Sequence, residues 1–303
     1  MIVDIAFSIN KKIYLSLLVA LNSILKNSKL DPDHPLRFNI AVPPGDRAFF
    51  EAQIHSAFAG LYPEYGPEAE LFRVREFLPS AYLDNYISLK FDEADVERQK
   101  SRRMQYGRLY LNDIFPDTRR IIYLDTDILV LGDIRELFAK GDQFTAERYV
   151  AAIPHLFPAM FYAKNVFKLW DDLRQIKNTF NGGVFMTDFC FWTDKTAQIR
   201  QHYLELDAAN GHDLLHLDDE AMLNLMFKNY IQLGIEWNAW GYGQPHFMVK
   251  FLRRSLDRIK IIHWSGGHHK PWESDRVIYA SLWKSYLPPT ASPRPVDAAG
   301  IMS

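Results

Sequence analysis

The chain has 303 residues, 48% hydrophobic and 24% charged, so it is long enough to bury the core of one large α/β domain or two smaller domains. Its net charge is −2, whereas general nucleic-acid binders carry an excess of basic residues. No apolar run approaches the roughly 18 residues of a membrane-spanning helix. The single cysteine, Cys190, excludes an intrachain disulfide, and the N-terminus has neither a charged leader nor a small-residue cleavage site. We therefore expect a cytoplasmic protein.

The first part of the chain alternates between apolar strands and amphipathic helices. Residues 2–8 form a predicted strand, and the apolar residues of the next segment recur at helical spacing over 13–28. The elements predicted after it are a strand at 36–42, a helix at 46–58 and a strand at 69–74. This alternation favours an α/β domain with a largely parallel sheet.

The rest of the chain continues the alternation. A helix is predicted at 92–112, where acids come first and bases follow, as the helix dipole favours. The later elements are an apolar strand at 121–124, a strand at 181–189, a helix at 217–229 and a strand at 258–264. We expect one domain over residues 1–287, and the segment 288–303, rich in Pro, Ala and Ser, to be a mobile tail.

Two aspartates, Asp125 and Asp127, directly follow the apolar strand at 121–124, with Thr126 between them. Residues i and i+2 of a strand point the same way, so the two carboxylates would repel each other unless a cation lay between them. Mn²⁺ and Mg²⁺ take oxygen ligands, and ligands of open α/β sheets bind beyond the carboxyl ends of strands. The alternative is an ordinary turn whose acids, like Asp133, face solvent.

A second candidate is the stretch "IIHWSGGHHKPW" at 261–272, where His263 ends a predicted strand. Gly266 and the glycine after it leave backbone N–H groups uncovered for an anion, and Lys270 adds a positive charge suited to phosphate. The alternative is a glycine-rich turn in which His263 is a structural histidine.

Three further motifs indicate a binding or catalytic role only when they are taken together. Asn181 and Gly182 could offer an amide and close backbone approach to a sugar, or simply form a tight turn. Asp219 and Glu220 begin a predicted helix, where the dipole favours acids in any case. Arg108 could bind a diphosphate in bidentate fashion, or lie on a solvated helix face.

The order of these motifs resembles glycosyltransferase family 8, whose members include bacterial lipopolysaccharide galactosyl- and glucosyltransferases and glycogenin. "YGRL" at 106–109 is similar to its Tyr-x-Arg-Leu, "YLDTDILV" to its D-x-D strand and "FNGGV" to its Phe-Asn-small-Gly-Val. The D-D-E stretch and the block H-x-x-G-x-x-x-K-P-W then follow in the family's order. The resemblance extends from about Ile2 to Trp272.

This resemblance implies a GT-A fold, in which a Rossmann-like, mixed and mostly parallel sheet is flanked by helices. It implies a nucleotide-sugar donor, such as UDP-glucose or UDP-galactose, and a saccharide or glycoconjugate acceptor. It further implies Mn²⁺, with Mg²⁺ as a substitute, and retention of the anomeric configuration. The implied protein is a hexosyltransferase of the kind that acts in lipopolysaccharide biosynthesis.

The resemblance also assigns roles to individual residues. The metal would be held by Asp125, Asp127 and His263. The nucleotide-sugar would be bound by Ser8, Asn10, Arg108, Asp125, Thr126, Asp127, Asn181, Gly182, Asp219, Gly266 and Lys270. The residues at the reacting sugar would be Asn181, Asp219 and Glu220, and Glu220 stands where the family often has Gln.

The sequence departs from the family pattern in two places. The family usually has an Asp near the end of the first strand for the uracil, and here Asn10 is expected in its place. The family's His and Lys are usually six residues apart, whereas His263 and Lys270 are separated by seven. We therefore expect the loop over the phosphates to bulge.

Two other functions compete with this interpretation. Phosphatases of the HAD type also place D-x-D after an apolar strand and carry a later Asp-Asp pair, although their motif usually lies near the N-terminus and continues with Thr where this chain has Leu129. A catalytically inactive nucleotide-sugar-binding protein on the same fold is the other alternative. The basic stretch 247–260 could rest on an anionic membrane or form a solvated helix face, and the sequence does not indicate an oligomeric state.

Overall fold

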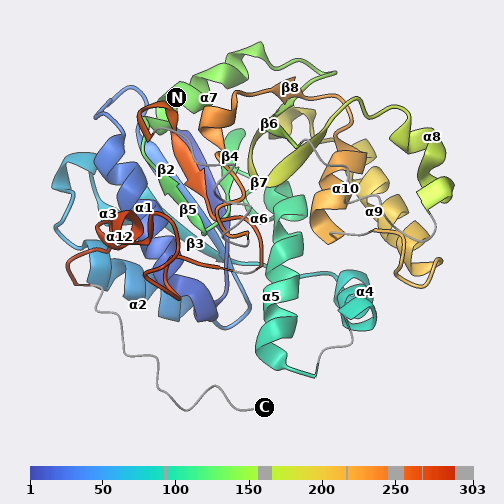
Figure 1. The fold of residues 1–303 in the computed structure, drawn as a ribbon, viewed down its shortest axis with the longest axis horizontal. Coiled ribbons are helices and arrows are strands. Elements are labelled where there is room, and N and C mark those ends of the chain that lie inside the picture. The colour runs from blue at the N-terminus through green and yellow to red at the C-terminus, as the bar shows by residue number, and fades with distance from the viewer. Residues whose placement is uncertain (92–93, 156–165, 216–217, 245–255, 268, 291–303) are drawn as a thin grey trace.

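A seven-stranded mixed sheet forms the centre of the protein, in a computed structural model that describes residues 1–91, 94–155, 166–215, 218–244, 256–267 and 269–290 (Figure 1). Its strands lie in the order β3 (Phe72–Glu76), β2 (Leu36–Val42), β1 (Val3–Ser8), β4 (Arg120–Leu124), β7 (Thr179–Asp188), β6 (Val150–His155) and β8 (Ile231–Gln232). Neighbouring strands are parallel except that β7 runs antiparallel to both β4 and β6. The predicted mixed, mostly parallel sheet is confirmed.

Helices cover both faces of the sheet, because successive residues of each buried strand point to opposite sides. In β4, Ile122 and Leu124 join the core with α1 (Tyr14–Asn27) and α2 (Arg47–Phe58). Ile121 and Tyr123 join a second core on the other face. Helices α5 (Val96–Gly107) and α10 (Asp218–Met226) lie against this second face, and α4 (Ala81–Phe91) and α9 (Asp194–Ala208) pack on them from outside (Figure 1).

A second, two-stranded sheet determines where the C-terminal part of the domain lies. Strand β5 (Ile128–Val130) begins four residues after β4 ends and pairs antiparallel with β9 (Ile261–His263). The register places Ile128 opposite His263, and the backbone N–H of Trp264 donates to Asp127 O at 2.9 Å. This pairing brings His263 beside the Asp125–Asp127 segment, although the two are more than 130 residues apart in the sequence.

Several predicted boundaries were wrong. Residues 69–74 divide between α3 (Glu68–Leu71) and β3, because Pro67 caps a short helical turn before the strand. The helix expected over 92–112 is α5, preceded by the capping residue Asp95 and followed by a 3-10 turn and α6 (Leu111–Ile114). The strand expected at 258–264 is reduced to β9.

The other short helices connect these elements. They are α7 (Ile134–Ala139), α8 (Trp170–Leu173) and α12 (Ala280–Lys284). Asp133 caps α7 by accepting the Arg135 N–H at 3.0 Å, which confirms that it is a turn residue. Most of the expected tail (291–303) and most of the basic stretch 247–260 lie outside the described residues. Within the described ranges, no helix combines the length and apolar character that crossing a membrane requires.

A buried charge cluster fixes the segment that leads into α10. Asp207 is fully buried and accepts the backbone N–H groups of Leu214 and Leu215, both at 2.8 Å, and the Tyr86 hydroxyl at 2.6 Å. Lys90 donates to the same carboxylate at 2.8 Å. Burial raises the pKa of Asp207, but the Lys90 ammonium outweighs it, so the pKa lies below its ordinary value and the residue is ionised.

Candidate active site

The two aspartates lie in the turn between β4 and β5, not in a strand. Strand β4 ends at Leu124, so the expectation that strand geometry aligns the carboxylates was wrong. The turn is held instead by backbone bonds, since Asp125 N–H donates to Gly183 O at 2.8 Å and Asp127 O accepts from Trp264. Both carboxylates thereby face the end of β9.

His263 completes a group of three candidate metal ligands with Asp125 and Asp127. One ligand atom from each of the three lies within 4.8 Å of the other two. His263 is 1% exposed, and its Nε2 lies 3.2 Å from Asp127 Oδ1 and 3.8 Å from Asp125 Oδ2. This Nε2 makes no hydrogen bond within the described part of the chain, which is unusual for a buried nitrogen.

The backbone of Gly183 packs directly against the side chains of His263 and Asp125. A Cβ at that position would lie 2.4 Å from His263 Cε1 and 2.6 Å from Asp125 Oδ2, so only glycine leaves the two side chains where they are. An unpaired imidazole nitrogen beside two carboxylates is a donor set that suits a divalent cation. The three residues therefore fit the metal that the sequence implied.

Lys270 reaches the same carboxylate despite the longer spacing from His263. Its Nζ lies 2.7 Å from Asp127 Oδ2 and donates to Trp264 O, also at 2.7 Å. Burial raises the pKa of Asp127, but Lys270 and the adjacent His263 imidazole outweigh it, and the pKa lies well below its ordinary value. Asp127 is therefore ionised at neutral pH.

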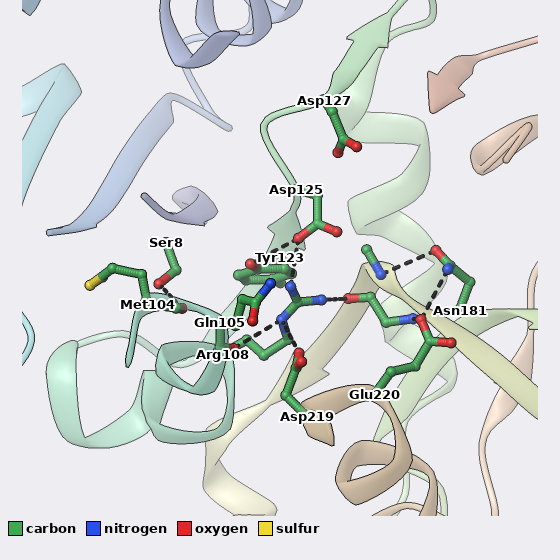
Figure 2. A network of polar contacts seen from close by, with 12 residues as sticks. Ser8, Met104, Gln105, Arg108, Tyr123, Asp125, Asp127, Asn181, Asp219 and Glu220 are labelled. Atoms are coloured by element: carbon green, nitrogen blue, oxygen red, sulfur yellow. Dashed lines mark hydrogen bonds and ion pairs between the residues drawn. The ribbon is translucent and has the colours of Figure 1, made fainter. Parts of the chain in front are cut away.

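Arg108 joins the D-x-D turn to the start of α10 (Figure 2). Its guanidinium lies 2.9 Å from Asp125 Oδ1 through Nη2 and 2.9 Å from Asp219 Oδ2 through Nε, and Nη1 donates to Gly182 O at 2.9 Å. The group also lies over the Tyr123 ring, 4.9 Å from its centre. Burial lowers the pKa of Arg108, but Asp125 and Asp219 outweigh it and raise the pKa above its ordinary value. The alternative of a solvated helix face is therefore wrong.

Glu220 and Asn181 hold each other in place beside Arg108. Glu220 Oε2 accepts Asn181 Nδ2 at 3.0 Å and the Gly182 N–H at 2.9 Å, as Figure 2 shows. Asn181 Oδ1 accepts the Gly183 N–H at 3.2 Å. Burial raises the pKa of Glu220, and the Gly182 N–H opposes that rise. The Asn181 amide, expected to face sugar hydroxyls, makes its bonds here within the protein.

A cavity of about 410 Å³ opens beside these groups at the carboxyl ends of β1 and β4. Of the predicted site residues, those that line it are Ser8, Asn10, Arg108, Asp125, Thr126, Asp127 and Lys270. Other predicted site residues do not line the cavity but contact Arg108, Asp127 or one another beside it. They are Asn181, Gly182, Asp219, Glu220 and His263. Gly266, with a left-handed φ of 110°, packs on Gln244 and does not line it.

The expected base-binding residues occupy the far end of the cavity. Ser8 ends β1 and its hydroxyl donates to Met104 O. Asn10 is buried, and its Oδ1 accepts the Lys12 N–H at 3.1 Å, so it caps the following 3-10 turn while it lines the cavity. A larger cavity of about 730 Å³ lies between α2 and the edge strand β3, and none of the predicted site residues lines it.

Several residues at the site were missed by the sequence analysis, among them Gln105, Trp272 and Asn238. Gln105 and Trp272 line the cavity, and Asn238 contacts His263 from behind. Trp272 belongs to the Lys-Pro-Trp sequence and could have been proposed on that ground. Gln105 and Asn238 carry no local signal, because neither belongs to a recognisable spacing.

The fold itself is shared with known enzymes. The structure of the galactosyltransferase LgtC with donor and acceptor sugar analogues matches it with a TM-score of 0.65 at 17% identity, covering 96% of this chain and 97% of that one. The protein therefore has the GT-A fold of glycosyltransferases.

The family is shown by the sequence. The model of "Glycosyl transferase family 8" matches residues 4–276, and the chain belongs to that family. A probable galacturonosyltransferase-like protein 4 of Arabidopsis thaliana is 25% identical over 94% of this chain and 78% of its own length. The glycosyltransferase 8 domain-containing protein 1 of Danio rerio is 26% identical over 67% of this chain, which matches only 61% of that relative. The predicted family is confirmed.

Proposed function

We propose that the protein transfers glucose or galactose from a UDP-sugar to a saccharide or glycoconjugate acceptor, with Mn²⁺ and with retention of the anomeric configuration. The observation that carries the proposal is the convergence of Asp125, Asp127 and His263 beside a 410 Å³ cavity. Membership of family 8 supports the transferase class, and the three cationic residues that line the cavity, Lys12, Arg108 and Lys270, support an anionic donor.

In this proposal the cavity holds the nucleotide and its diphosphate. The base lies near Ser8 and Asn10 at the end of β1, where ligands of α/β sheets bind. Lys270 moves its ammonium from Asp127 toward the phosphates, since a lysine on a flexible stem can exchange one anionic partner for another. Arg108 keeps its three bonds and so holds the Asp125 and Asp219 carboxylates in register.

The metal would be held by Asp125, Asp127 and His263. When bound, Mn²⁺ (or Mg²⁺) supplies the positive charge that stabilises the departing diphosphate. Asp127 is ionised because its pKa is lowered, and the His263 Nε2 has no competing hydrogen bond among the described residues. These two observations support the proposal that the three side chains can act as metal ligands.

The reaction breaks the bond between the sugar C1 and a diphosphate oxygen, and that oxygen keeps the electron pair. An acceptor hydroxyl forms the new bond to C1 from the same side, and its proton passes to the leaving phosphate oxygen. We favour this front-side attack over a covalent adduct on Glu220, because Glu220 Oε2 already accepts two hydrogen bonds. Asp219 and Asn181 then position the donor sugar, each held by its own partner.

Thermal unfolding with UDP, GDP and ADP, each with and without Mn²⁺, tests the donor. Binding to the folded state at 100 times Kd adds about 2.7 kcal/mol of stability, so a UDP- and Mn²⁺-dependent rise in Tm is expected. Turnover of UDP-glucose and UDP-galactose, followed by NMR of the product anomer, tests the reaction. Asp127→Asn should abolish both effects, and equal rates in this variant and the wild type would rule out the metal assignment. Tight UDP binding without turnover would favour the inactive binding protein instead.

A further inference from the structure

Asn238 is the buried partner of His263 on the side away from the carboxylates. It is fully buried, and its Oδ1 lies 2.9 Å from His263 Nδ1. Its Nδ2 donates to Asn181 Oδ1 at 2.9 Å. The backbone around it is tied to β9, because the next residue, Ala239, donates to Ile261 O and accepts from His263 N–H. Asn238 therefore cannot move independently of His263.

Asn238 is one link in a chain of four side chains. The chain runs from Glu220 through Asn181 and Asn238 to His263, with contacts of 3.0, 2.9 and 2.9 Å. It connects the carboxylate beside the cavity to the imidazole of the candidate metal site. Every contact between these side chains is at hydrogen-bond distance.

The direction of each bond in this chain is fixed from one end. The Gly183 backbone N–H can only donate, so the Asn181 atom that receives it must be the oxygen. The Asn181 amide nitrogen then faces Glu220, whose Oε2 also receives the Gly182 N–H. Asn238 must in turn present its nitrogen to the Asn181 oxygen.

The remaining bond determines which ring nitrogen of His263 must carry a proton. Asn238 presents its oxygen to His263, so the Nδ1 of His263 must be the donor. A neutral imidazole with its proton on Nδ1 has its free lone pair on Nε2. That atom is the one that lies 3.2 Å from Asp127 Oδ1 and makes no hydrogen bond among the described residues.

We propose that Asn238 is a positioning residue that holds His263 in the Nδ1-protonated tautomer, with its Nε2 lone pair directed at Asp125 and Asp127. Its role as a support for metal binding rests on the proposed function, whereas its effect on the tautomer does not. Groups that orient a ligating histidine through its second nitrogen typically change metal affinity 10–100-fold when they are replaced.

The test uses the full chain labelled with ¹⁵N-histidine at alkaline pH, without metal. Long-range ¹H–¹⁵N spectra distinguish the two tautomers, and His263→Gln identifies the signal. We expect the Nδ1–H tautomer in the wild type and a mixture or the Nε2–H tautomer in Asn238→Leu, which has a similar shape but no acceptor. Asn238→Asp keeps an acceptor and should keep the wild-type tautomer.

Titration calorimetry with Mn²⁺ alone measures the consequence. Asn238→Leu should weaken binding about 10- to 100-fold, and Asn238→Asp should weaken it less. The matched control is Asn39→Leu, which removes another fully buried amide, bonded to Asp4 at 2.8 Å on the distant β2, and should leave tautomer and affinity unchanged.

The proposal would be overturned by the Nε2–H tautomer in the wild type or by an unchanged tautomer in Asn238→Leu. If Asn238→Leu does not fold, the wild-type spectrum and the spectrum of Asn238→Asp test the proposal. Loss of the Nδ1–H signal in Asn238→Asp would contradict an acceptor role for this side chain. If the wild type shows the expected tautomer but does not bind Mn²⁺, the proposed function fails while the positioning role of Asn238 stands.

Discussion

Gly183→Ala should separate the folding of this protein from its proposed metal chemistry. The added methyl group would lie 2.4 Å from His263 Cε1 and 2.6 Å from Asp125 Oδ2. Carbon and oxygen atoms in ordinary contact are about 3.5 Å apart, so one or both side chains must retreat by roughly 1 Å. Both are candidate ligands, and neither can retreat far, since His263 is bonded to Asn238 and Asp125 to Arg108.

The expected cost is larger for function than for stability. Overpacking of a buried site costs about 1–3 kcal/mol, which a chain of this size tolerates. A misplacement of 1 Å at a catalytic site can lower a rate about 100-fold. We therefore expect Gly183→Ala to fold, to bind Mn²⁺ more weakly than the wild type, and to lose at least about 100-fold in kcat/KM.

Urea unfolding, calorimetry with Mn²⁺ and initial rates with a UDP-sugar measure these three quantities. The matched control is Gly267→Ala, because no heavy atom of the described residues lies within 4 Å of a Cβ at that position, its φ is not left-handed, and alanine keeps the backbone N–H. This variant should behave as the wild type in all three assays. Wild-type Mn²⁺ affinity and activity in Gly183→Ala would refute the steric argument and, with it, the placement of the two ligands.

Three further predictions address other ionisable groups of the protein. Glu220→Gln should keep kcat within about 10-fold, since an amide oxygen can accept the same two hydrogen bonds, and a loss of 1000-fold would instead indicate a nucleophile. Lys270→Ala should raise KM for the nucleotide-sugar about 10-fold or more with a smaller effect on kcat, and an unchanged KM would exclude Lys270 from the donor site. The folded-state pKa of Asp207 is lowered, so its stability contribution is present above the ordinary pKa of about 3.9 and is lost as pH falls through the lowered value. Asp207→Asn should therefore lower the free energy of unfolding at pH 7 by about 3–5 kcal/mol, because Lys90 loses its buried partner. Below pH 4 the urea midpoint of this variant should depend less on pH than that of the wild type. An equal dependence on pH would contradict this prediction.

Much of the fold could be predicted from local patterns. The apolar runs at 2–8 and 36–42 and the helical spacing over 13–28 correspond to β1, β2 and α1 within two residues. These elements are buried on regular faces, so hydrophobic periodicity reports them directly. Two of the errors fell at 69–74 and 92–112, where one apparent element was divided into two or three, and a third at 258–264, where the strand is reduced to β9.

The candidate site was predicted as a set of residues but not as an arrangement. The D-x-D, the histidine and the lysine were identified by type and order, and the structure places them together. Their geometry came from contacts that no local pattern records. Arg108, for example, read as either a phosphate ligand or a solvated residue, and it proved to be a buried bridge between Asp125 and Asp219.

The sequence by itself determined which chemical groups this protein has and in what order they follow its strands, because strand and helix formation depend on residues close together in the chain. Only the tertiary structure decided how those groups face one another. The register that sets Ile128 opposite His263, the backbone of Gly183 beneath Asp125, and the amide of Asn238 behind His263 all join residues far apart in sequence. Such contacts form only when these distant segments have come together in the folded domain, so the orientation of His263 is a property of the whole fold.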